Sequence, residues 1–167
     1  MDTGLAPISG YISIYAIYNP STGVSGVLAT NTTSIASTEV YSGVNMPAGY
    51  TTSALLSVWR TDASRLMVVG LQRGRRVETP FIPLIDINTE SGSSTVPVSL
   101  SVAGYLPVSA KTISGQLICE SMGASTVGMV LDVASTSIVN SIGGRFFNTV
   151  VIAGKTSQTP FSDMPLI

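Results

Sequence analysis

The sequence predicts an all-β protein, a β-sandwich or jelly-roll-like fold of antiparallel strands, and three observations support this prediction. Apolar and polar residues alternate with a period of two, the spacing of a half-buried strand. No segment has the 3.6-residue spacing of an amphipathic helix. Turn residues separate short apolar runs at intervals of roughly 8–12 residues, as in β-sandwiches. No change in composition clearly divides the chain, so we expect residues 1–167 to form one module, with a weak seam near 78–80.

The first predicted hairpin lies near the beginning of the chain. Residues 11–18, YISIYAIY, are β-branched and aromatic, and 19–23, NPSTG, provide the turn before the return strand at 24–30. Alternation places Tyr11 and Tyr15 on the more polar face of the first strand, together with Ser13. These two tyrosines are therefore the best candidates for exposure among the aromatic residues.

A second hairpin is predicted after an irregular stretch. Its strands are SALLSVWR, 53–60, and RLMVVGLQ, 65–72, and the turn between them is TDAS, 61–64. The Ser/Thr-rich residues 31–38 form a loop before it. Glycine and proline in the segment that follows this loop argue for irregular structure there.

The second half contains further predicted strands. Residues 80–87 are apolar but contain two prolines, which favours an edge strand or a crossing segment. Alternating patterns predict the remaining strands at 96–102, 111–120, 127–134 and 145–153. In the strand 111–120, the single cysteine, Cys119, falls on the apolar side and is expected to be a buried structural thiol.

The composition excludes several classes of function. Only 10% of the residues are charged, against about 25% in an average soluble domain, and the net charge is −1. No global field therefore attracts nucleic acid. The chain has no histidine, which rules out a Ser-His-Asp triad and histidine-containing zinc sites within it. No apolar run approaches the length of a membrane span, no signal-peptide pattern begins the chain, and no cofactor motif is present.

Five of the eight Lys and Arg residues are arginines between positions 60 and 76. Arg73 and Arg75 are predicted to lie on one side of an extended strand, and Arg76 on the other. Because the protein is acidic overall, we expect ion pairs with Asp62, with Glu78 or with acids of a neighbouring subunit. Contact with phosphate or an acidic sugar of a receptor is the less favoured interpretation.

Two further groups of residues are candidate sites. Aromatic rings can stack on sugar faces, so Tyr11, Tyr15 and Trp59 are candidate carbohydrate contacts, although packing in the core or at an interface is favoured. Asp86 and Glu90 flank a strand end and could form a pair for glycoside chemistry, but solvated loop carboxylates are the favoured interpretation. No metal-ligand cluster is present in the sequence, and no catalytic residue is assigned.

The first half contains the segments YAIYNP, MPAGYT and SVWRTDAS, and the second half contains the region from PVSAKTISGQLICE to TPFSDMPLI. These segments resemble the C-terminal β-rich module of tailed-bacteriophage tail fibre and tailspike proteins. The resemblance implies a homotrimeric virion protein that is made in the host cytoplasm and attaches to bacterial surface polysaccharide or lipopolysaccharide. It also implies that any polysaccharide-cleaving activity lies in a preceding domain, and that further β-sequence follows PFSDMPLI.

The sequence thus predicts a non-enzymatic module that serves trimerisation and, as a second role, glycan binding. Nucleic-acid binding and membrane insertion are not expected. Two alternatives stay open at this stage. One is a viral capsid jelly-roll or protrusion domain, which is also all-β and rich in hydroxyl groups. The other is a carbohydrate-active enzyme that uses a carboxylate pair such as Asp86 and Glu90.

Overall fold

The computed structural model describes residues 1–80, 104–120, 127–132, 145–151 and 156–165. Within these residues the secondary structure consists of nine strands and no helix, and every paired strand is antiparallel. The all-β prediction is therefore confirmed. The chain divides into two compact units, Met1–Asn88 with Val102–Ser109, and Thr89–Ser101 with Ala110–Ile167. The predicted strands at 80–87 and 96–102 lie almost entirely outside the described residues.

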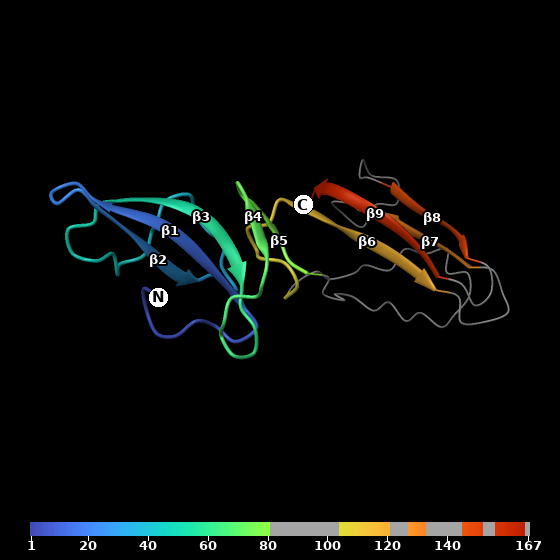
Figure 1. The fold of residues 1–167 in the computed structure, drawn as a ribbon, viewed down its shortest axis with the longest axis horizontal. Helices are drawn as coiled ribbons and strands as arrows, with labels where there is room; N and C mark the ends of the chain where they lie inside the picture. The colour runs from blue at the N-terminus through green and yellow to red at the C-terminus, as the bar shows by residue number, and fades with distance from the viewer. Residues whose placement is uncertain (81–103, 121–126, 133–144, 152–155, 166–167) are drawn as a thin grey trace. The chain divides into compact units, whose positions relative to one another are not determined.

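The first unit is built on a three-stranded sheet with the order β2-β1-β3 (Figure 1). β1 (Tyr11–Asn19) and β2 (Val24–Asn31) form the predicted hairpin, in which Asn19 pairs with Val24. The Asn19 side chain stabilises the turn, because its Oδ1 accepts hydrogen bonds from the amides of Ser21 and Thr22 at 3.0 and 3.2 Å. The predicted turn at NPSTG is thus confirmed, both in its position and in its stabilisation by the asparagine side chain.

β3 (Thr52–Arg60) is present as predicted, but its partner is β1 and not the segment 65–72. The turn TDAS closes a short loop, in which Asp62 Oδ1 accepts hydrogen bonds from the amides of Ser64 and Leu66. After this loop the chain makes a single bridge, between Thr61 and Met67, before it separates from β3. The second predicted hairpin is therefore wrong. β3 instead forms a ladder with β1 that runs from Thr52 to Arg60.

A β-bulge interrupts the ladder between β1 and β3. Ile14 pairs with Ser57 and Tyr15 pairs with Leu55, so Leu56 has no partner in β1. Before the bulge, odd-numbered residues of β3 share a face with Tyr15. After it, the even-numbered Val58 lies on that face.

The core of the first unit lies on the tyrosine face of β1, opposite to the prediction. Tyr15, Ile17, Leu28 and Tyr41 form the buried cluster, and the partly buried side chains packed against it are Met46, Tyr50 and Leu55. The segment around Tyr41 packs along the outer edge of β3, where Glu39 O accepts a hydrogen bond from Leu55 N at 2.8 Å. Irregular chain thus covers this face and makes it the buried one.

The N-terminal segment is fastened to the end of the sheet through a buried threonine. Thr61, which has no exposed surface, donates a hydrogen bond from Oγ1 to Pro7 O at 2.7 Å and accepts one from Gly10 N at 3.1 Å. Both partners lie more than 50 positions earlier in the chain. This hydroxyl therefore closes a long loop with one buried and one partly buried hydrogen bond.

Two short strands complete the first unit, β4 (Leu71–Arg73) and β5 (Arg76–Glu78), which pair with each other. In the second unit β6 (Thr112–Glu120) pairs with β9 (Thr156–Pro165), and β7 (Val127–Asp132) pairs with β8 (Arg145–Val151). The predicted strands that begin at 111, 127 and 145 are confirmed. β9 was not predicted, because its prolines and polar residues obscure the alternation.

Candidate functional site

The arginine-rich residues 71–78 form a hairpin. Gly74 and Arg75 are the two turn residues between β4 and β5, and Gly74 has a φ of 60°. Glycine with positive φ at the first turn position is the pattern of a type II′ hairpin. Arg73 and Arg76 are direct cross-strand partners, so they share a face. The prediction that Arg76 lies opposite Arg73 and Arg75 on one extended strand is therefore wrong, because the chain reverses between them.

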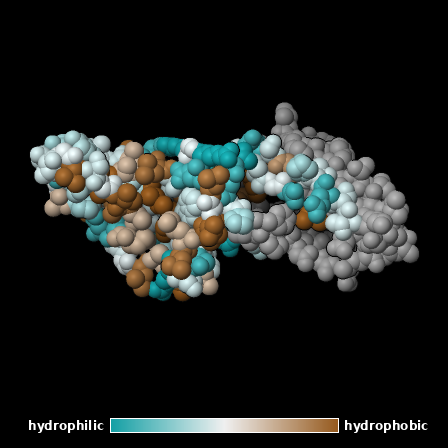
Figure 2. Space-filling model, in the orientation of Figure 1, coloured by the Kyte–Doolittle hydropathy of each residue, from teal (hydrophilic) through white to brown (hydrophobic). Residues whose placement is uncertain are grey.

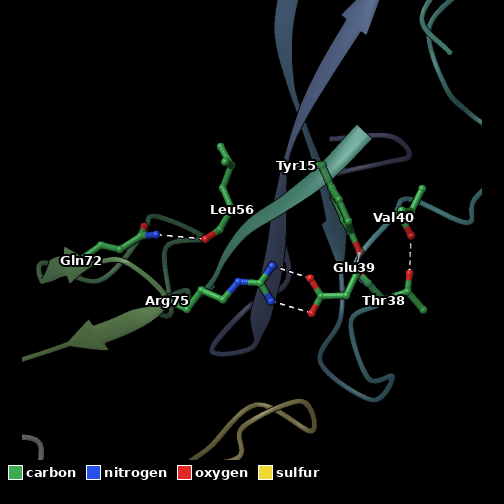
Figure 3. A network of polar contacts seen from close by, with 7 residues as sticks. All are labelled: Tyr15, Thr38, Glu39, Val40, Leu56, Gln72 and Arg75. Carbon is green, nitrogen blue, oxygen red and sulfur yellow. Dashed lines mark hydrogen bonds and ion pairs between the residues drawn. The ribbon is translucent and has the colours of Figure 1, made fainter. Parts of the chain in front are cut away.

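Arg75 forms a two-pronged ion pair with Glu39 (Figure 3). One prong joins Nη1 to Oε1 at 2.5 Å, and the other joins Nη2 to Oε2. This hydrogen bonding holds the pKa of Glu39 below its ordinary value and raises the pKa of Arg75. The sequence does not single out Glu39 as the partner, since 36 positions separate the two residues.

The other arginines of the hairpin differ in their contacts. Arg76 Nε lies 3.1 Å from Glu78 Oε1, which confirms the predicted pairing with Glu78. Asp62 uses its carboxylate for the loop amides described above, and no ion pair to it is found among the described residues. The described residues likewise contain no acidic partner within ion-pair distance of Arg73. A role of these arginines at a subunit or receptor interface stays a prediction.

Gln72 ties the hairpin to the bulge of β3. Its side-chain Nε2 donates a hydrogen bond to Leu56 O at 3.0 Å (Figure 3). It donates another to Gly74 O at 2.7 Å. Leu56 is the residue without a partner in β1, so its carbonyl group is available to this amide. The hairpin is thus held at two points, by Gln72 on β3 and by Arg75 on Glu39.

Tyr11 and Tyr15 are buried, with 4% and 3% of their surface exposed, so they are packed side chains, as the favoured interpretation has it, and not the exposed aromatic residues of the alternative. They lie on the core face of β1. The Tyr15 hydroxyl donates to Thr38 O at 3.1 Å, and its ring meets that of Tyr41 edge to face at 5.8 Å. Burial raises the pKa of Tyr11, which Arg60 partly offsets. Neither ring presents a stacking surface to a glycan on the described chain.

Trp59 is half-buried and uses its polar group internally. The indole Nε1 donates a hydrogen bond to Val68 O at 2.6 Å. A side chain on Gly70 would come within 3.1 Å of the indole ring, so the absence of one lets the loop pack against it. These contacts make Trp59 a support for the loop after β3, and a glycan contact through its exposed part stays a prediction.

The remaining candidates have little structural description. Asp86 and Glu90 lie outside the described residues, and so does the side chain of Cys119. In the described part of the chain, no group of three or more His, Cys, Asp or Glu residues is placed to hold a metal ion. Among those same residues, no helix has the length and apolar character of a membrane span.

A hydroxyl-lined pocket beside the core was not predicted. It has a volume of about 160 Å³ and lies between Asp2, the end of β2 and residues 35–43. Asp2 Oδ2 accepts a hydrogen bond from the Tyr41 hydroxyl at 3.2 Å, and the same hydroxyl accepts one from Asn45 N at 3.0 Å. Burial is the main cause that raises the pKa of Tyr41, and the Asp2 carboxylate adds to it. The only sequence signal was the Ser/Thr-rich composition of residues 31–38.

Comparison with known proteins adds no relative, because no family model, curated protein or solved structure matches the chain.

Proposed function

We propose that the chain is a non-catalytic module of a phage tail fibre or tailspike, which trimerises and attaches to a bacterial surface glycan. The observation that carries the proposal is an apolar sheet face that is uncovered toward the β1–β2 turn, although Ile12 on the same face is buried. Val27, Ala16 and Ala54 lie side by side across β2, β1 and β3, on the face opposite Tyr15. Val27 is 69% exposed.

The residues beside Val27, Ala16 and Ala54 are mostly small, which makes this face suitable for close packing. Across β2, β1 and β3 the face holds a shallow hollow of about 170 Å³, lined mainly by small residues such as Ser25 and Thr52. Small side chains allow a second sheet to approach closely, and face-to-face sheets pack about 10 Å apart. Exposed apolar surface of this kind marks interaction sites.

The balance of exposed and buried residues supports assembly as well. Among the residues whose side-chain burial the structure describes, six hydrophobic side chains are buried, whereas many large ones are exposed, several of them on the first unit (Figure 2). A closed symmetric oligomer would bury the same face of each copy. The resemblance to tail fibre modules favours three copies, and the hydroxyl-rich, weakly charged surface is compatible with binding to a glycan.

Light scattering after gel filtration tests the assembly. We expect a mass three times that of the 17.3 kDa chain. Val27→Asp places a charge on the exposed apolar sheet face, on the edge strand β2, and should give a monomer, because a buried unpaired charge is costly. Val44→Asp is the matched control, since Val44 is 95% exposed on a loop.

Three results would contradict the proposal. If the wild-type protein is a monomer, the proposed trimer is wrong. A much larger assembly would favour the capsid-domain alternative. A trimer that survives Val27→Asp would show that another surface holds the copies together.

A further inference from the structure

The outer edge of β2 carries main-chain groups without hydrogen-bond partners. β2 is a terminal strand of its sheet, so one of its edges pairs with β1 and the other is open. Thr32 N donates to Tyr11 O at 2.9 Å, so the even-numbered residues of this ladder direct their main-chain groups to β1. The odd-numbered Ser25 and Val27 direct theirs outward. No residue in the described part of the chain bonds to these outward groups.

The N-terminal segment occupies this edge at one end. Asp2 N donates a hydrogen bond to Ala29 O at 2.7 Å, which confirms that odd-numbered residues of β2 face outward. Ser25 and Val27 lie beyond this contact, nearer to the β1–β2 turn, and both are exposed. The open part of the edge therefore offers the amide and the carbonyl group of each of these two residues to another strand.

β2 lacks the features that keep natural edge strands apart. Such strands commonly carry charged side chains, a proline or a bulge. β2 contains no proline, and the chain has no Asp, Glu, Lys or Arg between positions 3 and 38. The ladder between β1 and β2 has no register shift, so no bulge turns the edge away. Val24 and Val27 are 51% and 69% exposed. An uncharged, regular edge with exposed valines is suited to pairing with another strand.

The free groups are arranged so that β2 can pair with β2 of a second copy. When two such strands run antiparallel about a two-fold axis at Gly26, Ser25 of each copy lies opposite Val27 of the other. These opposite residues exchange both of their hydrogen bonds, so every free group of Ser25 and Val27 finds a partner. An axis at Val27 would instead set Ser25 against Ala29, whose carbonyl group already accepts from Asp2. The hydrogen bonding therefore selects the axis at Gly26.

The side chains of β2 are compatible with this arrangement. Gly26 has no side chain at the axis, where two identical residues meet. Val24 of each copy lies opposite Leu28 of the other, which joins two apolar side chains. A two-fold axis also brings each strand close to its own equivalent, so a charge near the axis would repel itself. Because β2 carries no charge, its edge suits a second copy of the same strand.

We propose that β2 pairs edge to edge with β2 of a second copy of this chain, antiparallel and with Gly26 at the two-fold axis. This contact goes beyond the proposed function, because it uses the edge of the strand and not the sheet face assigned to the trimer. A contact limited to residues 24–28 belongs with the small interfaces, below about 1,200 Å², which are weak. We therefore expect it to join trimers at high protein concentration and to leave the mass of dilute samples unchanged.

Disulfide trapping tests the register. In the proposed pairing Gly26 lies opposite its own equivalent in a non-hydrogen-bonded pair, with the Cα atoms about 4.5 Å apart, which a disulfide can span. Gly26→Cys should therefore give a disulfide-linked dimer when concentrated protein is mildly oxidised, and peptide mass spectrometry identifies the linked residue. The fold accommodates the change, because the nearest atom to an added Cβ is Ile17 Cγ1 at 3.4 Å. Thr22→Cys, in the exposed β1–β2 turn, is the control and should not link to its equivalent.

A second pair of variants tests the main-chain hydrogen bonds. Added to Gly26→Cys, Ser25→Pro removes an outward amide and puts a ring carbon in the path of the second strand. It breaks no ladder bond within the copy, because this amide is free. Ser25→Ala removes the same hydroxyl group and keeps the amide. We expect the proline to lower the yield of linked dimer at least about tenfold and the alanine to leave it unchanged.

Two results would overturn the proposal. One is equal linking by Gly26→Cys and Thr22→Cys, and the other is linking through Gly26→Cys that persists with Ser25→Pro. The first comparison does not depend on how well the proline variant folds. Light scattering of dilute samples separates this contact from the proposed function. A trimer that does not link through Gly26→Cys would overturn the edge pairing alone, and a monomer that does link would overturn the trimer alone.

Discussion

Arg75 reaches back 36 residues to hold Glu39, and both nitrogen atoms of its guanidinium end face both oxygens of the carboxylate. Glu39 also supplies the backbone carbonyl that accepts from Leu55 N on the edge of β3. One residue thus connects the β4–β5 hairpin to the main sheet of the first unit, by its side chain on one side and its backbone on the other.

Arg75→Gln should raise the pKa of Glu39 toward the ordinary glutamate value. The pKa is lowered in the folded protein chiefly by hydrogen bonding to Arg75. The stability that the pair contributes is therefore present above the unfolded pKa of about 4.3 and is lost as pH falls through the lower folded pKa. Carboxyl NMR titration measures the shift. Arg73→Gln is the control and should leave the Glu39 titration unchanged.

Gly74→Ala should weaken the hairpin by about 1–2 kcal/mol, because an L side chain with this positive φ is strained. No atom lies within 4 Å of the added methyl group, so the cost would come from the backbone alone. Gly74→Asn should cost less, since asparagine tolerates left-handed φ. Hydrogen exchange of the β4 and β5 amides measures both. Equal protection in all three proteins would contradict the assigned turn.

Thr61→Val should destabilise the first unit by about 1–3 kcal/mol, although it nearly preserves shape. The change removes the hydroxyl that donates to Pro7 O and leaves Gly10 N without its acceptor. Urea denaturation followed by tryptophan fluorescence reports the loss, with Thr22→Val as the exposed control. An unchanged unfolding midpoint would show that the N-terminal segment is not held by this residue.

Tyr15→Ala should cost about 3–5 kcal/mol, as for other large aromatic residues removed from a core. Tyr15→Phe should cost about 0.5–1.5 kcal/mol, because it keeps the ring contact with Tyr41 and loses only the hydrogen bond to Thr38 O. Thermal unfolding measures both. If Tyr15→Ala were as stable as the wild type, the tyrosine face would not be the core.

The fold was predictable from the sequence where local signals and long-range pairing agree. The β1–β2 hairpin follows from alternation on both sides of a turn that Asn19 stabilises through its own side chain. The second hairpin failed because Asp62 forms a local loop, while β3 finds a longer ladder on β1. Turn residues indicate that the chain bends but do not identify the strand it then joins.

The buried face and the candidate site were harder to predict. Both faces of β1 carry apolar residues, and tyrosine is compatible with either, so the choice depends on the distant segment that contains Tyr41. The partner of Arg75 and the pocket around Thr32 depend on the same segment, which has no regular periodicity. Sequence spacing does not determine which contacts an irregular chain makes.

The bulge at Leu56 also fixes the phase of β3. Because Leu56 is passed over in the ladder, Leu55 and Val58 face the same side, and Trp59 pairs with Ile12 on the other. If Leu56 were paired in a regular ladder, Trp59 would turn toward the tyrosine core, whereas deleting Leu56 should keep the present faces and leave Gln72 without the carbonyl it binds. The bulge residue thus determines on which face of the sheet each residue between Ser57 and Arg60 lies.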